Sequence, residues 1–126
     1  MSRIVIIEDD PLMRSLMAEW LTAEGYAVQG VGGDNGQTPP SVDLVIVDVY
    51  MPRCLGVARL RSARRACPGV PIIAISAQFR SGLDCAGPTA QALGVDRVIA
   101  KPFGRKALLH AVRSVIGLAV LDTAGE

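Results

Sequence analysis

The sequence predicts a doubly wound α/β domain built on a five-stranded parallel sheet. Five short apolar runs, rich in β-branched residues, alternate with helical or loop-like connections. Parallel strands require such crossovers, and right-handed crossovers place helices on both faces of a sheet. Several runs end on a polar residue, as is typical of strands whose carboxyl ends form a ligand-binding edge. One domain is expected, because 126 residues is the ordinary size of a single core.

The composition excludes several classes of partner. Hydrophobic residues make up 50% of the chain, and 13 Lys and Arg balance 12 Asp and Glu, so no global field favours nucleic acid or a membrane surface. No apolar run approaches a membrane span, and we expect a soluble, cytoplasmic protein. The three cysteines, Cys54, Cys67 and Cys85, have no C-x-x-C spacing, which predicts reduced thiols instead of a zinc site.

A strand and a helix open the chain. Residues 3–7 form a β-branched run that is followed by three acids, Glu8, Asp9 and Asp10. Asp10 before Pro11 predicts a helix N-cap with proline at the first helical position. We expect the helix to reach about residue 24. Its apolar face is expected to consist of two rows, Leu12, Leu16 and Trp20 beside Met13, Met17 and Leu21.

The next two strands enclose an irregular connection. Residues 26–31 predict the second strand, and four apolar residues running into Asp48 predict the third, buried on both faces with a carboxylate at its tip. The segment between them, GGDNGQTPPS, contains three glycines and two prolines and has no helical period. We therefore expect the second helix of the domain to be shortened or missing.

The second half of the chain supplies two more strands. Residues 70–76 predict a buried strand that ends on Ser76, and residues 97–100 predict a fifth strand that ends at Lys101.

Helices are predicted around these two strands. Residues 55–66 form an expected helix with Val57, Leu60 and Ala63 inward and its arginines outward. A short helix is predicted at residues 88–93 and a longer one at residues 105–116, where the apolar face consists of Leu108, Leu109, Val112 and Ile116.

Polar residues from four strand ends converge on one predicted edge: the acids after the first strand, then Asp48, Ser76 and Lys101. Carboxylates brought close together repel, and a bound cation removes that conflict. Oxygen ligands without histidine or cysteine predict Mg²⁺. Together with a lysine and a hydroxyl, this set suits phosphoryl transfer, with Asp48 as the nucleophile that forms an acyl phosphate.

With these residues, the sequence resembles the response-regulator receiver domains of bacterial two-component signalling. Four motifs carry the resemblance, in the order IVIIEDDPLMR, DLVIVDVYMP, PIIAISA and VIAKPF. The resemblance implies a flavodoxin-like sheet with strand order 2-1-3-4-5. It also implies one receiver domain over residues 1–126, with a core at about 3–117 and a tail at 118–126.

The resemblance implies a role for each candidate residue. Asp48 would be the phospho-accepting aspartate, Ser76 would bind the phosphoryl group, and Lys101 would supply the counter-charge before a cis peptide bond to Pro102. Mg²⁺ would be bound by Asp9 directly, by Glu8 through water, by Asp48 and by the carbonyl of Tyr50. Asp10 is interpreted as a helix cap and not as a ligand. Aligning Arg14 with the family places its acidic pair one residue earlier, at Glu8 and Asp9.

Two alternatives remain open on the sequence. The first is a pseudo-receiver that keeps the fold without phosphorylation-driven switching. Two features favour it: Val98, three residues before Lys101, stands where the family usually has an aromatic residue, and the second helix is expected to be lost. A small phosphatase with an aspartyl nucleophile is the other alternative. That class needs a second acid two residues after the nucleophile, where Tyr50 stands.

The leading hypothesis is a phosphorelay receiver. It would take its phosphoryl group from a histidine kinase or a histidine phosphotransfer protein, and it would catalyse only its own phosphorylation and dephosphorylation. Only a short tail follows the last predicted helix, so output is expected through contacts with an unknown protein partner and not through direct nucleic-acid binding, unless the chain is a fragment. The cognate kinase, the output target, the oligomeric state and the phosphoryl lifetime do not follow from the sequence.

Overall fold

The computed structural model describes residues 2–8, 10–31, 42–48, 54–76 and 94–117, with the backbone alone at 31 and 54–59. The strands are β1 (Arg3–Ile7), β2 (Ala27–Val31), β3 (Leu44–Asp48), β4 (Ile72–Ser76) and β5 (Arg97–Ala100). The helices described are α1 (Pro11–Ala23), α2 (Cys54–Ala66) and α4 (Arg105–Ile116). The strands form one sheet of order β2-β1-β3-β4-β5, and all neighbours are parallel. The predicted doubly wound sheet and its strand order are confirmed.

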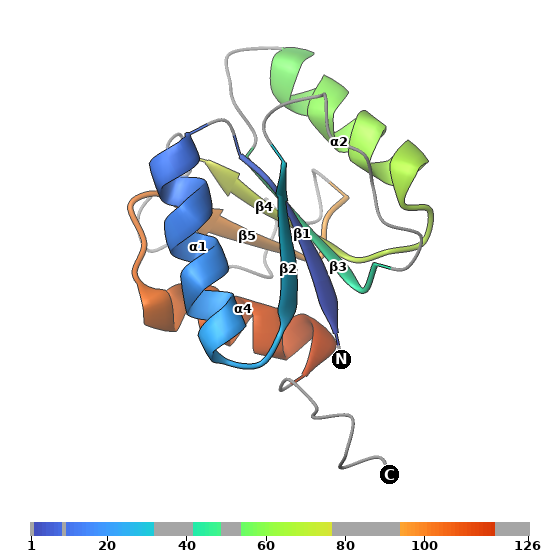
Figure 1. Ribbon diagram of the computed structural model, residues 1–126. Helices are drawn as coiled ribbons and strands as arrows, with labels where there is room; N and C mark the ends of the chain where they lie inside the picture. The colour runs from blue at the N-terminus through green and yellow to red at the C-terminus, as the bar shows by residue number, and fades with distance from the viewer. Residues whose placement is uncertain (1, 9, 32–41, 49–53, 77–93, 118–126) are drawn as a thin grey trace, which may run out of the picture.

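Helices cover both faces of this sheet, with α1 and α4 on one side and α2 on the other (Figure 1). Alternate residues of β1, β3, β4 and β5 enter two separate cores. On the first face, Ile46 and Ile73 pack with Leu21 and Leu108 and are completely buried. On the second face, Val45 and Val47 pack with Leu60 and Ala63 of α2. Burial on both faces explains why the central strands are continuous apolar runs.

The apolar face predicted for α1 is only half correct. The row of Met13, Met17 and Leu21 faces the core, with Trp20 packed against it. Leu12 and Leu16 are instead 81% and 39% exposed. Because each residue turns a helix by about 100°, Leu12 and Leu16 lie on the flank of the helix, and Trp20 is the residue of their predicted row that packs against the core.

Two predicted strands start later than their apolar runs do. The amide of Tyr26 donates to the carbonyl of Leu21 and so completes the end of α1, which leaves Ala27 as the first residue of β2. Gly25 makes this turn with a φ of 98°. Pro71 has no amide hydrogen to give to a strand ladder, and β4 begins one residue after it.

Three other expectations fall outside the described residues: the shortened second helix at 32–41, the short helix at 88–93, and the tail at 118–126. Of the cysteine side chains, that of Cys67 is described, and it is buried as predicted. No helix in the described ranges has both the length and the apolar character needed to cross a membrane.

Polar contacts join the end of α1 to α4 across the first face. The Glu24 carboxylate pairs with Arg105 at 2.8 Å and with Arg113 at 2.7 Å. The Tyr26 hydroxyl donates to the carbonyl of Gly117 at 2.7 Å, just beyond α4. These contacts fix the last helix against the junction between α1 and β2.

Candidate functional site

The register of the sheet brings four strand ends to the same edge. Ile7 lies opposite Val47, so Glu8 and Asp48 follow paired positions of β1 and β3. Ser76 lies opposite Ala100, which directly precedes Lys101. The predicted convergence of these strand ends is therefore observed for the described part of the site.

Lys101 is the centre of the site. Its Nζ lies 3.0 Å from Oε1 of Glu8 and 3.3 Å from Oδ1 of Asp48. One ammonium group thus bridges two carboxylates that come from different strands. The side chains are largely withdrawn from solvent, with exposed fractions of 2% for Glu8, 13% for Asp48 and 20% for Lys101.

Burial and pairing act against each other on these groups. Burial raises the pKa of Glu8 above its ordinary value, while the hydrogen bonds from Lys101 and from the Asp10 amide oppose that rise. Burial acts to lower the pKa of Lys101, but the hydrogen bond to Glu8 and the charge of Asp48 outweigh it, and its pKa is raised. Lys101 is therefore protonated at neutral pH and holds the two acids together.

Glu8 is engaged through both of its carboxylate oxygens. Oε1 accepts from Lys101, and Oε2 accepts from the backbone amide of Asp10 at 3.2 Å. Asp10 itself caps α1, since its Oδ1 accepts from the amide of Leu12 at 3.0 Å and from that of Met13. The interpretation of Asp10 as a cap is confirmed.

Ser76 and Lys101 are tied together at the end of the sheet. The amide of Lys101 donates to the carbonyl of Ser76 at 3.0 Å, and the Ser76 side chain is buried. The expected cis peptide bond between Lys101 and Pro102 is present. Val98 is 1% exposed and lies in the core under α2, so a small buried side chain occupies the position that is usually aromatic in the family.

One residue near the site has a contact that sequence reasoning did not predict. Arg14, on the first turns of α1, donates from Nη1 to the carbonyl oxygen of Glu8 at 2.7 Å. An arginine one turn into a surface helix is ordinarily a solvated side chain, so its identity alone carried no signal. The glycine at position 30, within β2, was the available clue.

Two of the predicted metal ligands, Asp9 and Tyr50, lie outside the described residues. Within the described ranges, no group of three His, Cys, Asp or Glu side chains gathers as a metal site would require. Glu8 and Asp48 nevertheless suit a hard divalent cation, because both supply carboxylate oxygens and Lys101 neutralises only one of their two negative charges. Asp9, the residue after Glu8, would add the third acid.

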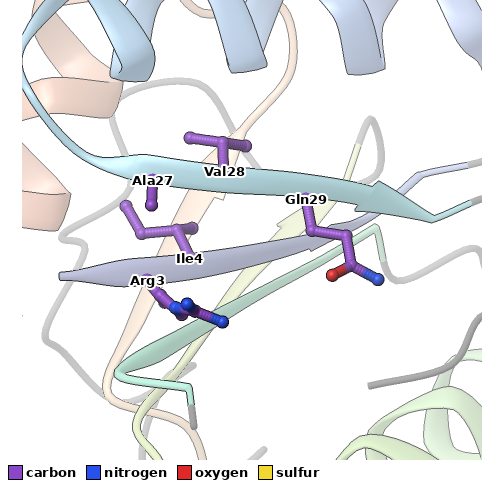
Figure 2. A pocket seen from close by; sticks show the side chains of 5 residues that line it. All are labelled: Arg3, Ile4, Ala27, Val28 and Gln29. Atoms are coloured by element: carbon purple, nitrogen blue, oxygen red, sulfur yellow. The ribbon is translucent and has the colours of Figure 1, made fainter. Parts of the chain in front are cut away.

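Two hollows formed by described residues lie away from this edge. One lies on the amino-terminal half of β1 and on β2; Figure 2 shows the side chains that line it, Arg3, Ile4, Ala27, Val28 and Gln29. The other lies before β4 and β5, beside Arg64 and Asp96. Neither contains Glu8, Asp48, Ser76 or Lys101.

Comparisons with known proteins agree on one family. The family described as response regulator receiver domain matches residues 4–113. The transcriptional regulatory protein CpxR of Klebsiella pneumoniae is 31% identical over 120 residues, which are 92% of this chain and 50% of CpxR. The chain therefore spans about half the length of the curated relatives that it matches.

Solved structures give the same result. The non-phosphorylated HemR receiver domain of Leptospira biflexa is 26% identical with a TM-score of 0.73, and the match covers 96% of this chain and 98% of that domain. The response regulator TrrA of Thermotoga maritima, solved in complex with Mg²⁺-BeF, is 26% identical with a TM-score of 0.66. That match covers 91% of this chain and 99% of TrrA.

Proposed function

The chain belongs to the response regulator receiver domain family, and from that premise we propose that it accepts a phosphoryl group on Asp48 from a histidine kinase or a histidine phosphotransfer protein. One observation carries this proposal: the Lys101 ammonium is held between Glu8 and Asp48 at the carboxyl edge of the sheet. A reactive carboxylate with a fixed positive charge beside it is what phosphoryl transfer to an acid requires.

In the proposed reaction, a carboxylate oxygen of Asp48 attacks the phosphorus of a phosphohistidine. The new O–P bond forms as the P–N bond to the imidazole breaks, and the leaving nitrogen keeps the electron pair and takes up a proton. Lys101 would exchange its contact with Oδ1 of Asp48 for one with a phosphoryl oxygen. Ser76, at the end of the neighbouring strand, would donate its hydroxyl hydrogen to a second phosphoryl oxygen.

A cation completes the proposed site. Asp9 and Asp48 would hold Mg²⁺ with the carbonyl of Tyr50, and Glu8 would act through water, since both of its oxygens already accept hydrogen bonds. When bound, Mg²⁺ neutralises charge on the transferred phosphoryl oxygens. The complex of the related TrrA with Mg²⁺-BeF supports this part of the proposal.

The proposal extends to partners and output. The chain would act in the cytoplasm, catalyse only its own phosphorylation and dephosphorylation, and signal by changing its affinity for a protein partner. The relatives named as transcriptional regulatory proteins are about twice as long as the matched region, so their regulatory activity is not transferred to this chain.

Mass spectrometry tests the proposal directly. Incubation with acetyl phosphate and Mg²⁺ is expected to add one labile phosphoryl group to the wild-type chain and none to Asp48→Asn. The matched control is Asp43→Asn, which changes an acid just before the other end of β3, where it accepts a hydrogen bond from the Arg3 amide. Phosphorylation that survives Asp48→Asn, or none in the wild type, would reject Asp48 as the acceptor.

The buried Val98 keeps the pseudo-receiver as a second candidate. A pseudo-receiver predicts that beryllofluoride, a mimic of the acyl phosphate, leaves the backbone amide spectrum of β4, β5 and α4 unchanged. A switching receiver predicts shifts beyond the residues that contact the mimic. Comparison of the ¹H–¹⁵N spectra with and without beryllofluoride and Mg²⁺ separates the two.

A further inference from the structure

The residue that follows β1, Glu8, is held by a side chain that has no role in the proposed reaction. Arg14 is half-buried, and its Nη1 donates to the carbonyl oxygen of Glu8 at 2.7 Å. Its own amide donates to the carbonyl of Asp10 at 2.9 Å and so begins the helix. Arg14 therefore connects the first turn of α1 to Glu8, the residue that follows β1.

Gly30 provides the space in which the arginine lies. A Cβ atom at position 30 would lie 2.9 Å from both Cγ and Cδ of Arg14, closer than real Cβ contacts. A glycine in the middle of a strand normally weakens the strand, and a close approach by another group is a common reason for one. The aliphatic stem of Arg14 thus lies against Gly30 of β2, where the side chain of any larger residue would displace it.

Two hydrogen bonds hold the groups that flank residue 9 in the chain. On one side, the Glu8 carbonyl accepts from Arg14. On the other side, the Asp10 amide donates to the Glu8 carboxylate. Rotation of the Glu8 carbonyl or of the Asp10 amide would break a hydrogen bond, and the one from Arg14 is charge-assisted and short. Side chains therefore hold the Glu8 carbonyl and the Asp10 amide, the described groups on either side of residue 9.

We propose that Arg14 is a positioning residue, seated over Gly30, that fixes the backbone of Glu8 after β1 for cation binding at the phosphoryl-transfer site. This inference rests on the proposed function, because the cation in question is the one that serves Asp48. In the proposed role, Arg14 contacts neither the cation nor the phosphoryl group and acts only through the backbone of Glu8.

A packing role for Arg14 makes a different prediction from a positioning role. Methionine keeps most of the aliphatic stem over Gly30 but cannot donate to the Glu8 carbonyl, whereas lysine keeps the charge and one donor. If the stem alone mattered, Arg14→Met would behave as the wild type. If the donated hydrogen bond matters, Arg14→Met binds Mg²⁺ more weakly than the wild type does, and Arg14→Lys keeps at least part of the wild-type affinity.

The first experiment is calorimetric titration with Mg²⁺ on the full chain. Arg14→Met is expected to weaken Mg²⁺ binding by about tenfold, the lower range for loss of a residue that orients a ligand, and Arg14→Lys is expected to recover part of this loss. Arg64→Met is the matched control, since Arg64 donates to the Gly94 carbonyl at 2.9 Å, before β5 at the other end of the sheet. It is expected to bind Mg²⁺ as the wild type does.

The second experiment tests the role of Gly30. Gly30→Ala should weaken Mg²⁺ binding in the wild-type background by pushing the Arg14 stem aside. In the Arg14→Ala background the added methyl group has room, and Gly30→Ala should change nothing further. An equal effect in both backgrounds, or wild-type Mg²⁺ affinity in Arg14→Met, would overturn the proposal.

A metal-free measurement separates failure of this inference from failure of the proposed function. In EDTA, Arg14→Met should shift the backbone amide resonance of Asp10 and increase its hydrogen exchange, whether or not the chain binds Mg²⁺. If the wild type itself neither binds Mg²⁺ nor is phosphorylated, the proposed function fails. An unchanged Asp10 amide in Arg14→Met would reject the positioning role even when the wild type is phosphorylated normally.

Discussion

Lys101 balances two acids that the fold withdraws from water. Its replacement by methionine keeps a similar volume but leaves Glu8 and Asp48 without their shared positive charge. We expect Lys101→Met to lower the free energy of unfolding by about 3 kcal/mol at pH 7, the lower range for breaking a buried pair, because the lysine is 20% exposed.

Urea denaturation of Lys101→Met beside Lys106→Met measures this effect. Lys106 is exposed on α4 and controls for loss of a surface charge. Equal midpoints for the two variants would contradict the bridging role of Lys101.

At the residue scale, the sequence predicted which side chains meet but not how they pair. Glu8, Asp48 and Lys101 each follow directly on an apolar strand, so parallel pairing was sufficient to bring them together. Glu8 is almost fully buried and accepts hydrogen bonds from both Lys101 and the Asp10 amide. This arrangement depends on the tertiary fold around Glu8. The contact of Arg14 with the Glu8 carbonyl depends on the same tertiary geometry.

Helix α1 offers an internal comparison of two leucines. Leu21 is completely buried, whereas Leu12 is 81% exposed on the flank of the same helix. We expect Leu21→Ala to cost about 2–5 kcal/mol of stability through lost burial and a cavity. Leu12→Ala should change stability by less than about 0.5 kcal/mol. Thermal and urea unfolding check both, and similar losses would contradict the observed orientation of α1.

The contact between α1 and α4 predicts a pH effect. The hydrogen bond from Arg105, with that from Arg113, holds the pKa of Glu24 below its ordinary value of 4.5. A carboxyl group with a lowered folded-state pKa stabilises the fold above its unfolded pKa and loses that contribution as the pH falls through the folded value.

Glu24→Gln should therefore lower the Tm slightly at pH 7, and the difference from the wild type should shrink as the pH falls through the folded-state pKa of Glu24, which lies below 4.5. The control is Glu19→Gln, an exposed acid on the same helix. A Tm difference for Glu24→Gln that persists unchanged in acid would contradict the ion-pair explanation.

Element boundaries show where sequence reasoning works and where it fails. The strand at 97–100 was predicted with its observed bounds, and the helix predicted at about 105–116 is observed there, because both apolar patterns end at turn residues. The strands at 26–31 and 70–76 were predicted too long, because Tyr26 closes a helix and Pro71 lacks an amide. Leu12 and Leu16 of α1 were misplaced, because periodicity does not say how wide a stripe of the helix the sheet covers.

At the scale of the whole molecule, the only tryptophan of the chain contacts a residue that is close in sequence to Lys101. Trp20, the only tryptophan of the chain, makes an edge-to-face contact with Phe103, with ring centroids 6.5 Å apart and planes at 67°. Phe103 lies two residues beyond Lys101. We expect beryllofluoride with Mg²⁺ to change the Trp20 emission, because Lys101 would move toward the mimic and Phe103 would adjust with it.

Two variants test the origin of this signal. Asp48→Asn should abolish the change in emission, and Phe103→Leu should reduce it while leaving phosphorylation intact. A full signal in Phe103→Leu would show that Trp20 senses the site by another route.

The class of fold and the strand order were predictable because five apolar runs and the receiver-like motifs pointed to the same topology. The length favoured a single core, but the structure has two core clusters, one on each face of the sheet, because the central strands are apolar on both faces. The way in which the last helix is held was not predictable. Its polar contacts pair Glu24 with two arginines from a distant part of the chain, and no local pattern encodes such a pairing.

Those distant pairings have a consequence for how the chain folds. Lys101 and Glu8 are 93 residues apart in sequence, Tyr26 and Gly117 are 91 apart, and Glu24 and Arg113 are 89 apart. Such contacts join residues that are far apart in the chain, which slows folding relative to proteins with local contacts. A nascent chain on the ribosome can therefore begin its sheet early, but the pairing of Glu8 with Lys101 waits until residue 101 has been synthesised.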